Sequence, residues 1–239
     1  MRVLVIQHDH VSPPGAVGSR LVERGAELVL HQVVPAERHR SPGVATEFPD
    51  AAGFDAVVAM GAPWSVYDEA AIGSWVGPEL DLLRRADRHG VPVLGLCFGG
   101  QLLAAAHGGA VLRAEAPELG WTAVETDDPA LVPAGPWFEW HFDRWDLPPG
   151  AREVARNAVT SQAFVLRRNL AVQFHPELDA AMLRLWLDAG GAGVARALGH
   201  DPGDLLRRTR DEEPAARHRA ALLVDAFLEQ VAAVPHARR

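Results

Sequence analysis

Residues 91–107 read VPVLGLCFGGQLLAAAH, and this stretch decides the fold. The apolar run over 91–96 predicts a buried strand, and the segment from about 100 to 107 predicts a helix. The residues between them are Cys97, Phe98, Gly99 and Gly100. A strand that passes directly into a helix is typical of a parallel sheet, in which helices carry the chain back across the sheet. We therefore expect Cys97 to lie on a sharp turn at the carboxyl end of a strand.

The chain on either side continues this alternation. Before the turn, the sequence predicts strands over 2–7, 27–34 and 55–60, and helices over 17–25 and 78–89. After it, strand-like pieces with tight turns predict late antiparallel strands over 110–115, 121–126, 137–147, 152–159, 162–167 and 170–174. Helical patterns follow over 179–189 and from about 193 to 234. The expected fold is a doubly wound α/β domain of the flavodoxin-like class, a mostly parallel sheet flanked by helices. Residues 1–192 would form the domain, and 193–239 a helical extension packed on it.

Composition excludes several classes of protein. The chain has 239 residues, of which 48% are hydrophobic and 23% charged, so it can bury a core and is not globally disordered. All 23 basic residues are arginines, which excludes a P-loop lysine and a Schiff-base lysine. The formal charge of −8 argues against nucleic-acid binding. A single cysteine excludes an internal disulfide and a cysteine-based zinc site.

The sequence also bears on location. No apolar run reaches about 18 residues, so we expect no membrane span. The first residues predict a strand rather than a signal peptide, because Asp9 follows it at once. The expected compartment is the cytoplasm.

Cys97 is the first candidate for chemistry. The helix that begins behind it favours negative charge and so stabilises a thiolate. The backbone N–H of Phe98 points to where an oxyanion would form, and the glycines at 99 and 100 allow close approach. The alternative is an inert buried cysteine, which is the usual state of a free cysteine. The strand–helix junction and the glycines favour the nucleophile.

A second candidate is the segment His175-Pro176-Glu177. Pro176 favours an extended backbone at His175, and in an extended chain residues two apart point to the same side. His175 and Glu177 can therefore act together as a base and the carboxylate that orients it. Taken alone, the segment would read as a strand end with a capping histidine. A competent cysteine elsewhere in the chain favours the catalytic interpretation.

Two other groups are weaker candidates. His8-Asp9-His10 could ligate a metal, but the sequence provides no third ligand, so we interpret it as a polar rim of loop residues and expect no metal site. Five aromatic residues are better explained as core and pocket wall than as a stacking platform for nucleic acid, given the acidic charge. They are Trp137, Phe138, Trp140, Phe142 and Trp145.

These motifs together resemble the class I glutamine amidotransferases, in particular the stand-alone type similar to the amidotransferase domain of GMP synthase. The resemblance rests first on Gly95-Leu96-Cys97-Phe98-Gly99-Gly100-Gln101, followed 78 positions after the cysteine by His175-Pro176-Glu177. The segment 60–68 (MGAPWSVYD) resembles the family's glycine-rich oxyanion strand. The segment 140–143 (WHFD), with 147–150 (LPPG) behind it, resembles the chain beside the glutamine pocket. The resemblance covers about residues 2–190.

The resemblance implies a role for each matched residue. Cys97 would attack the side-chain amide of glutamine, His175 would transfer the protons, and Glu177 would orient His175. The oxyanion hole would be formed by backbone N–H groups of Gly61 or Ala62 and of Phe98. The substrate would be held by Gln101, His141 and Phe142. Glutamate and ammonia would leave through a γ-glutamyl thioester, and no cofactor is required.

The sequence departs from the family at two positions and leaves several alternatives open. Gly100 stands where most members carry histidine, and Ala62 stands where glycine is common, which requires a negative φ at Ala62. Because the chain lacks an ATP-activating domain, a synthase reaction would need an ammonia-accepting partner protein. A γ-glutamyl hydrolase or peptidase with the same triad and a non-catalytic interaction module remain alternatives. The sequence does not decide whether the chain forms a homo-oligomer.

Overall fold

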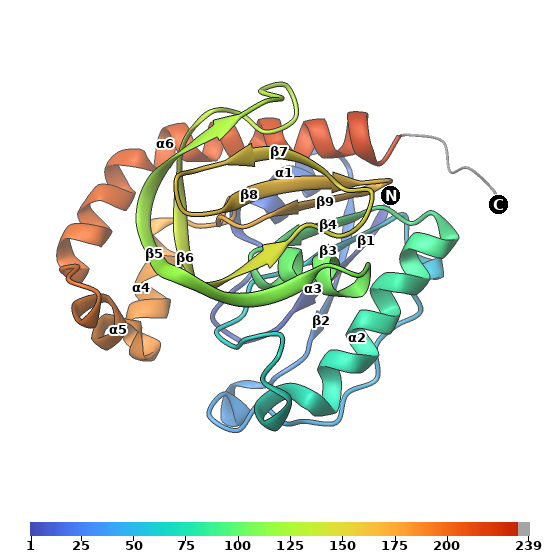
Figure 1. The fold of residues 1–239 in the computed structure, drawn as a ribbon, viewed down its shortest axis with the longest axis horizontal. Helices are drawn as coiled ribbons and strands as arrows, with labels where there is room; N and C mark the ends of the chain where they lie inside the picture. Colours follow the sequence, from blue (N-terminus) through green and yellow to red (C-terminus); the bar gives the residue numbers. More distant parts are fainter. Residues whose placement is uncertain (234–239) are drawn as a thin grey trace.

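The computed structural model describes residues 1–233. Nine strands form one sheet in the order β2-β1-β3-β4-β9-β8-β7-β5-β6 (Figure 1). The first five strands in this order are parallel: β2 (Glu27–Gln32), β1 (Arg2–Gln7), β3 (Ala56–Ala59), β4 (Val93–Leu96) and β9 (Asn169–Val172). The predicted doubly wound, mostly parallel sheet is thereby confirmed.

The second half of the sheet is antiparallel. It consists of β8 (Ser161–Leu166), β7 (Arg152–Arg156), β5 (Ala110–Thr126) and β6 (Gly135–Asp146). The prediction of two separate pieces over 110–115 and 121–126 is wrong, because β5 runs through both. Its pairing with β6 shifts register between Arg113 and Glu118. Pro117 lies in this interval and cannot donate a ladder hydrogen bond, so the sequence there reads as a break.

Helices cover the two faces of the parallel half (Figure 1). Successive residues of β1 alternate between them, so that Val3 and Val5 pack toward α1 (Gly15–Glu23) and α6 (Pro202–Ala226). Leu4 and Ile6 pack toward α2 (Glu69–His89) and α3 (Phe98–Ala106). Burial on both faces explains why these strands read as continuous apolar runs.

The helix predicted to begin at residue 78 begins nine residues earlier. Asp68 caps it by accepting a hydrogen bond from the Ala71 N–H, and Gly90 ends it with φ +70°. Proline is common in the first turn of a helix, so Pro78 suggests a start that the structure places in the interior. The predicted boundary is therefore wrong, because a local signal for a helix start was overridden by packing.

The C-terminal part contains three helices. α4 (Ala180–Trp186) continues through a wider turn at Leu187–Gly191 into α5 (Ala192–Ala197), and α6 then runs to a last turn at Phe227–Val231. Buried residues of α5 and α6 share an apolar cluster with β5 and β6. Residues 234–239 of the expected extension lie outside the described residues.

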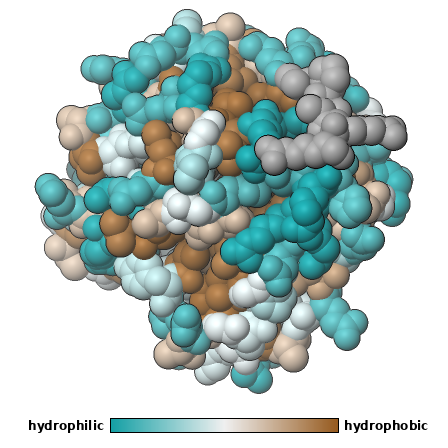
Figure 2. Space-filling model, turned by 45° about the vertical axis from the view of Figure 1, so that its right-hand side comes forward, coloured by the Kyte–Doolittle hydropathy of each residue, from teal (hydrophilic) through white to brown (hydrophobic). Residues whose placement is uncertain are grey.

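The surface is mixed in character. On the face drawn in Figure 2, hydrophilic residues surround smaller apolar areas. The large apolar side chains that are exposed come from many different elements rather than from one helix or strand. Within residues 1–233, no helix has the length and apolar character needed to cross a membrane.

Candidate functional site

Cys97 lies on a strained turn between β4 and α3. Its φ of +49° and ψ of −105° lie outside the regions that residues with a Cβ ordinarily occupy. The chain can make this turn only because its neighbours are small. A Cβ added to Gly99 would lie 2.0 Å from the Ala59 carbonyl oxygen, and one added to Gly95 would lie 2.6 Å from the Gly99 carbonyl oxygen. The turn therefore presents the cysteine at the carboxyl end of the sheet, as a nucleophile elbow does.

His175 and Glu177 reach the same place from the neighbouring strand. β9 pairs in parallel with β4, with Leu96 opposite Val172, so the segments that follow the two strands lie side by side. His175 Nδ1 is 2.9 Å from Glu177 Oε1, and both side chains are buried. The structure therefore brings Cys97, His175 and Glu177 together although 78 positions separate the first two.

The electrostatics of this group favour a charged imidazole. Burial alone would lower the pKa of His175, but the Cys97 sulfur and the Glu177 carboxylate raise it well above its usual value. The ring is confined further by Trp186, which packs edge-on at 4.9 Å between centroids. The arrangement is one in which a carboxylate holds an imidazole beside a cysteine sulfur.

Two further residues lie against Cys97 and His175. Gln173 Nε2 lies 3.5 Å from Cys97 Sγ and can donate a hydrogen bond to a thiolate. Gly61 lies against both members of the pair. A Cβ added there would be 3.1 Å from His175 Cε1 and 3.8 Å from Cys97 Cβ. The absence of a side chain at 61 is thus part of how the imidazole is positioned.

The predicted oxyanion residues flank the cysteine. Gly61 and Ala62 follow β3, which neighbours β4, and Phe98 is the first residue of α3. Among the residues that the structure describes, only Cys97 and Arg167 combine a side chain with positive φ. Ala62 therefore avoids the backbone conformation in which its Cβ would be penalised.

The glycine at position 100 has a packing explanation. A Cβ added to Gly100 would lie 3.0 Å from the Trp145 ring and 3.0 Å from the Val172 carbonyl oxygen. Trp145 is almost completely buried. In this protein, an indole ring fills the space that a side chain at position 100 would require.

A cavity of about 360 Å³ opens onto these residues. Its lining includes Cys97, His175 and all three residues predicted to hold the substrate, which are Gln101, His141 and Phe142. The aromatic residues Trp64, Trp140 and Trp186 form part of its wall. A cavity of this size accommodates a small organic molecule.

The side chains of the three residues predicted to hold the substrate already contact other parts of the protein. The Gln101 amide donates to the Asp143 carbonyl oxygen at 3.2 Å and to Gln173 Oε1 at 3.3 Å, so it is engaged with the protein. His141 Nδ1 likewise donates to the Asp143 carbonyl oxygen, at 2.9 Å. Phe142 packs under the guanidinium of Arg113, 4.7 Å from its ring centre.

Asp143 connects two of the segments that the sequence singled out. Its carboxylate is nearly buried and accepts hydrogen bonds from Ser65 Oγ at 2.5 Å and from the Tyr67 hydroxyl at 2.8 Å. Segment 60–68 is thereby fixed to β6. These contacts set one wall of the cavity relative to Cys97 and His175.

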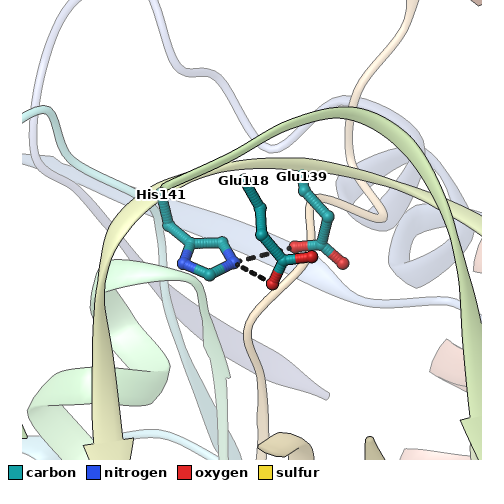
Figure 3. A group of neighbouring side chains, drawn as sticks. All are labelled: Glu118, Glu139 and His141. Carbon is teal, nitrogen blue, oxygen red and sulfur yellow. Dashed lines mark ion pairs between the residues drawn. The ribbon is translucent and has the colours of Figure 1, made fainter. Parts of the chain in front are cut away.

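His141 also belongs to a buried charged cluster beside the site. Figure 3 shows one ring nitrogen of His141 facing the carboxylates of Glu118 and Glu139. The distances from Nε2 are 3.1 Å to Glu118 and 3.4 Å to Glu139. Burial opposes a charge on His141, but the two carboxylates raise its pKa to about 10. Burial also raises the pKa of Glu139.

The ligand atoms of this cluster lie within 4.8 Å of one another, close enough to hold a metal ion. However, a protonated His141 has no free lone pair to offer a metal. Both carboxylate oxygens of Glu118 already accept hydrogen bonds, from Asn157 at 2.6 Å and from Gln162 at 3.0 Å. In the structure the three side chains form a buried ion-pair network that supports the strand carrying His141.

The sequence did not predict the buried pair of His8 and Glu79, and it wrongly placed His8 and Asp9 on an exposed rim. His8 and Asp9 do not form an exposed rim, since both are buried. His8 pairs with Glu79 of α2, which is also completely buried. The pattern at 8–10 carries no signal for this contact, because the partner is 71 positions away and lies on a helix. Trp186 was missed too, since its helical segment does not reveal which face meets the cavity.

Comparisons with known proteins point to one family. Residues 16–182 match the family profile of the class I glutamine amidotransferases. A glutamine-hydrolysing GMP synthase from Aeropyrum pernix is 34% identical over 214 residues, which are 82% of this chain and 38% of that protein. One subunit of the glutamine-hydrolysing GMP synthase of Sulfurisphaera tokodaii is 34% identical over 134 residues, 52% of this chain and 68% of that protein.

The fold has a close counterpart among solved structures. A glutamine amidotransferase from Methylobacillus flagellatus superposes with a TM-score of 0.83 at 25% identity, covering 96% of this chain and 95% of that one. Matches to full-length GMP synthases cover much less of those proteins, 23% to 38% in two examples. The family match extends over more than half of the chain and includes both the cysteine elbow and the His-Pro-Glu segment. The chain therefore belongs to the class I glutamine amidotransferase family.

Proposed function

We propose that the chain hydrolyses the side-chain amide of glutamine through Cys97, His175 and Glu177 and supplies the ammonia to an acceptor on a partner protein. One observation carries the proposal. An imidazole held by a carboxylate at 2.9 Å lies beside a cysteine on a strained strand-to-helix turn. Such a group suits acyl transfer from an amide to a thiol.

The first half of the reaction forms a thioester. The Cys97 thiolate attacks the carboxamide carbon of glutamine, a C–S bond forms, and the electron pair of the C=O bond moves onto oxygen. Backbone N–H groups of Ala62 and Phe98, with Gly61 beside them, stabilise this oxyanion. The His175 imidazolium gives its proton to the amide nitrogen, the C–N bond breaks, and ammonia leaves.

The second half releases glutamate. A water molecule gives a proton to the neutral His175 and attacks the thioester carbon. The tetrahedral intermediate collapses with cleavage of the C–S bond, which regenerates the thiolate. Glu177 stabilises the imidazolium in both halves by accepting from Nδ1.

We infer that the polar wall of the cavity holds the amino-acid end of the substrate. Gln101, His141 and Phe142 line this wall, but the side chains of Gln101 and His141 are already engaged with the protein. Their contribution is therefore through backbone groups and through the shape of the wall. The contact between Asp143 and segment 60–68 keeps that shape fixed.

The acceptor is expected on a separate protein chain. The relative from Sulfurisphaera tokodaii is named as one subunit of a glutamine-hydrolysing GMP synthase, which implies a second one in that organism. The chain described here contains no lysine and no phosphate-binding loop motif. An ammonia-accepting partner would therefore have to bring the activated substrate.

The apolar wall of the cavity supports a second candidate, a γ-glutamyl hydrolase. Trp64, Trp140 and Trp186 line the cavity near the catalytic group. Apolar walls of this kind favour a leaving amine that carries an aromatic or aliphatic substituent. The same triad would then release that amine in place of ammonia.

Glutamate release from glutamine tests the proposal, with a γ-glutamyl anilide assayed in parallel and Cys97→Ala as the control. Release from glutamine that disappears in Cys97→Ala supports the amidotransferase reaction. Turnover of the anilide alone identifies the hydrolase. No turnover of either substrate, combined with alkylation of Cys97 no faster than that of an ordinary thiol, would refute both.

A further inference from the structure

A buried ion pair lies directly behind the proposed oxyanion hole and has no role in the chemistry described so far. His8 follows β1 and Glu79 lies in the middle of α2, and neither side chain is exposed. His8 Nε2 is 3.0 Å and 3.1 Å from the two carboxylate oxygens of Glu79. Burying two such groups costs free energy unless close pairing and further hydrogen bonds offset the loss of water.

Both nitrogens of His8 face acceptors. Nε2 faces the Glu79 carboxylate, and Nδ1 lies 3.2 Å from the carbonyl oxygen of Gly61. A carbonyl oxygen can only accept, so Nδ1 donates to Gly61; with Glu79 ionised, Nε2 donates to its carboxylate as well and the ring is an imidazolium. Burial lowers the pKa of His8, but the Glu79 carboxylate and the Gly61 carbonyl raise it by more. The pKa of His8 therefore lies above the usual value for histidine.

The contact with Gly61 fixes one peptide plane. The described residues contain no cis peptide bond, so the N–H of Ala62 points opposite to the carbonyl of Gly61. Because that carbonyl is directed at His8, the N–H is directed away from the buried pair. Gly61 and Ala62 line the catalytic cavity. Within residues 1–233 no acceptor is assigned to the Ala62 N–H.

His8 also supports the other proposed donor. Its ring packs edge-on against the ring of Phe98, with 4.9 Å between centroids, and stacks on Trp75 at 5.8 Å. One imidazolium therefore contacts both chain segments that would supply N–H groups to an oxyanion. Glu79 in turn anchors that imidazolium to α2.

We propose that His8, held by Glu79, is a positioning residue that fixes the Ala62 N–H in the oxyanion hole. This inference rests on the proposed function. An oxyanion donor acts on the transition state and not on the bound substrate, so loss of its support lowers kcat and kcat/KM together and leaves KM nearly unchanged. The nucleophilicity of Cys97 does not depend on the oxyanion hole and should be unaffected.

The test compares variants that keep or lose the donor to Gly61. Glu79→Gln removes the charge, so a neutral His8 remains as a weaker donor. In that background, His8→Asn keeps an N–H donor near the position of Nδ1, whereas His8→Leu removes it at similar volume. Starting from Glu79→Gln avoids an unpaired buried carboxylate. Thr209→Val is the matched control, since it removes a buried hydrogen bond to Trp121 that involves none of His8, Gly61 and Phe98.

The readouts are kcat and KM for glutamine, the rate of Cys97 alkylation by iodoacetamide, and thermal unfolding. We expect kcat to fall about 3-fold to 10-fold in Glu79→Gln and about 10-fold to 100-fold when His8→Leu is added, below the loss seen on deleting an oxyanion donor itself. His8→Asn should recover most of the second loss. KM and the alkylation rate should change less than about 3-fold, and Thr209→Val should leave kcat unchanged.

Several outcomes would overturn the inference. Wild-type kcat in both Glu79→Gln and the leucine variant would show that the pair does not act on the reaction. A parallel loss of kcat and alkylation rate would show that the pair maintains only the elbow. If the leucine variant does not fold, Glu79→Gln decides alone. A reduced kcat with an unchanged alkylation rate supports the inference, and an unchanged kcat overturns it. Wild-type protein that hydrolyses neither substrate, and whose Cys97 is alkylated no faster than an ordinary thiol, would refute the proposed function itself.

Discussion

Replacing Cys97 by glycine should make the protein more stable than replacing it by alanine. At most buried positions the opposite holds, because glycine loses more backbone entropy on folding and has no Cβ to bury. Cys97 has φ +49° and ψ −105°, where a Cβ is strained and glycine is not. The strain belongs to the backbone conformation, so alanine retains it and glycine releases it.

The magnitude follows from three contributions. A residue held in such a conformation costs on the order of 1–3 kcal/mol, which glycine recovers. The greater entropy of glycine in the unfolded chain offsets about 0.5–1 kcal/mol. Loss of one buried methyl group offsets up to about 0.8 kcal/mol. We expect the free energy of unfolding of Cys97→Gly to be about 0.5 kcal/mol higher than that of Cys97→Ala. At an unstrained buried position, replacing alanine by glycine should instead lower the free energy of unfolding by about 1.5 kcal/mol.

Urea unfolding of three proteins measures the difference. Ala104, buried in α3 just beyond the elbow, provides the unstrained comparison as Ala104→Gly in the Cys97→Ala protein. The two alanine-to-glycine changes should differ by about 2 kcal/mol, which corresponds to roughly 4–8 °C in Tm for a chain of this size. If glycine destabilises position 97 as much as position 104, the elbow is unstrained and the reasoning is refuted.

Three further predictions concern the site and the C-terminal helix. Gly61→Ala should lower kcat at least about tenfold, because the new Cβ would lie 3.1 Å from His175 Cε1 and displace the ring. Steady-state kinetics, with an unfolding curve for each protein, measure this loss, and an unchanged kcat would contradict the prediction. Glu177→Gln should lower kcat/KM by about 10²–10⁴-fold. It should also shift the alkaline limb of the pH profile to lower pH, because Glu177 raises the pKa of His175; a limb that stays in place would contradict the assigned role. Asp225→Asn should cost about 1 kcal/mol at pH 7, measured by urea unfolding. The hydrogen bond from Arg20 lowers the pKa of Asp225, so the stabilisation that Asp225 provides is present above the ordinary pKa of 3.8 and is lost as the pH falls through the lowered value. If Asp225→Asn remains less stable than wild type in acid, the ion-pair explanation is contradicted.

The sequence predicts best what depends on neighbouring residues. The strand, turn and helix around Cys97 follow from a local pattern of apolar and small residues, and the side-by-side placement of His175 and Glu177 follows from Pro176. What brings these segments together is the insertion of β9 beside β4. No local pattern specifies that strand order, so only the family resemblance could place His175 next to Cys97.

The misses have physical causes as well. Pro78 carries the local signal of a helix start, yet the packing of α2 against the sheet extends the helix past it. The sequence does not reveal how deeply a histidine after a strand is buried, so His8 reads as a rim residue although Glu79 holds it in the core. Trp186 lies at the end of α4 and faces the cavity, where its indole N–H donates to the Val11 carbonyl oxygen at 3.0 Å. Each miss involves a contact between residues that are far apart in sequence.

The pairing of β9 with β4 has a consequence for how the chain is made. While the ribosome has delivered only the residues before 169, β4 is an open edge of a growing sheet, and its unpaired backbone groups are free to associate with other chains. The nascent polypeptide then already carries Cys97 but neither His175 nor Glu177. Under the proposed mechanism, amide hydrolysis therefore has to wait for Glu177, which is synthesised 80 residues after Cys97, since the imidazole is not held before then.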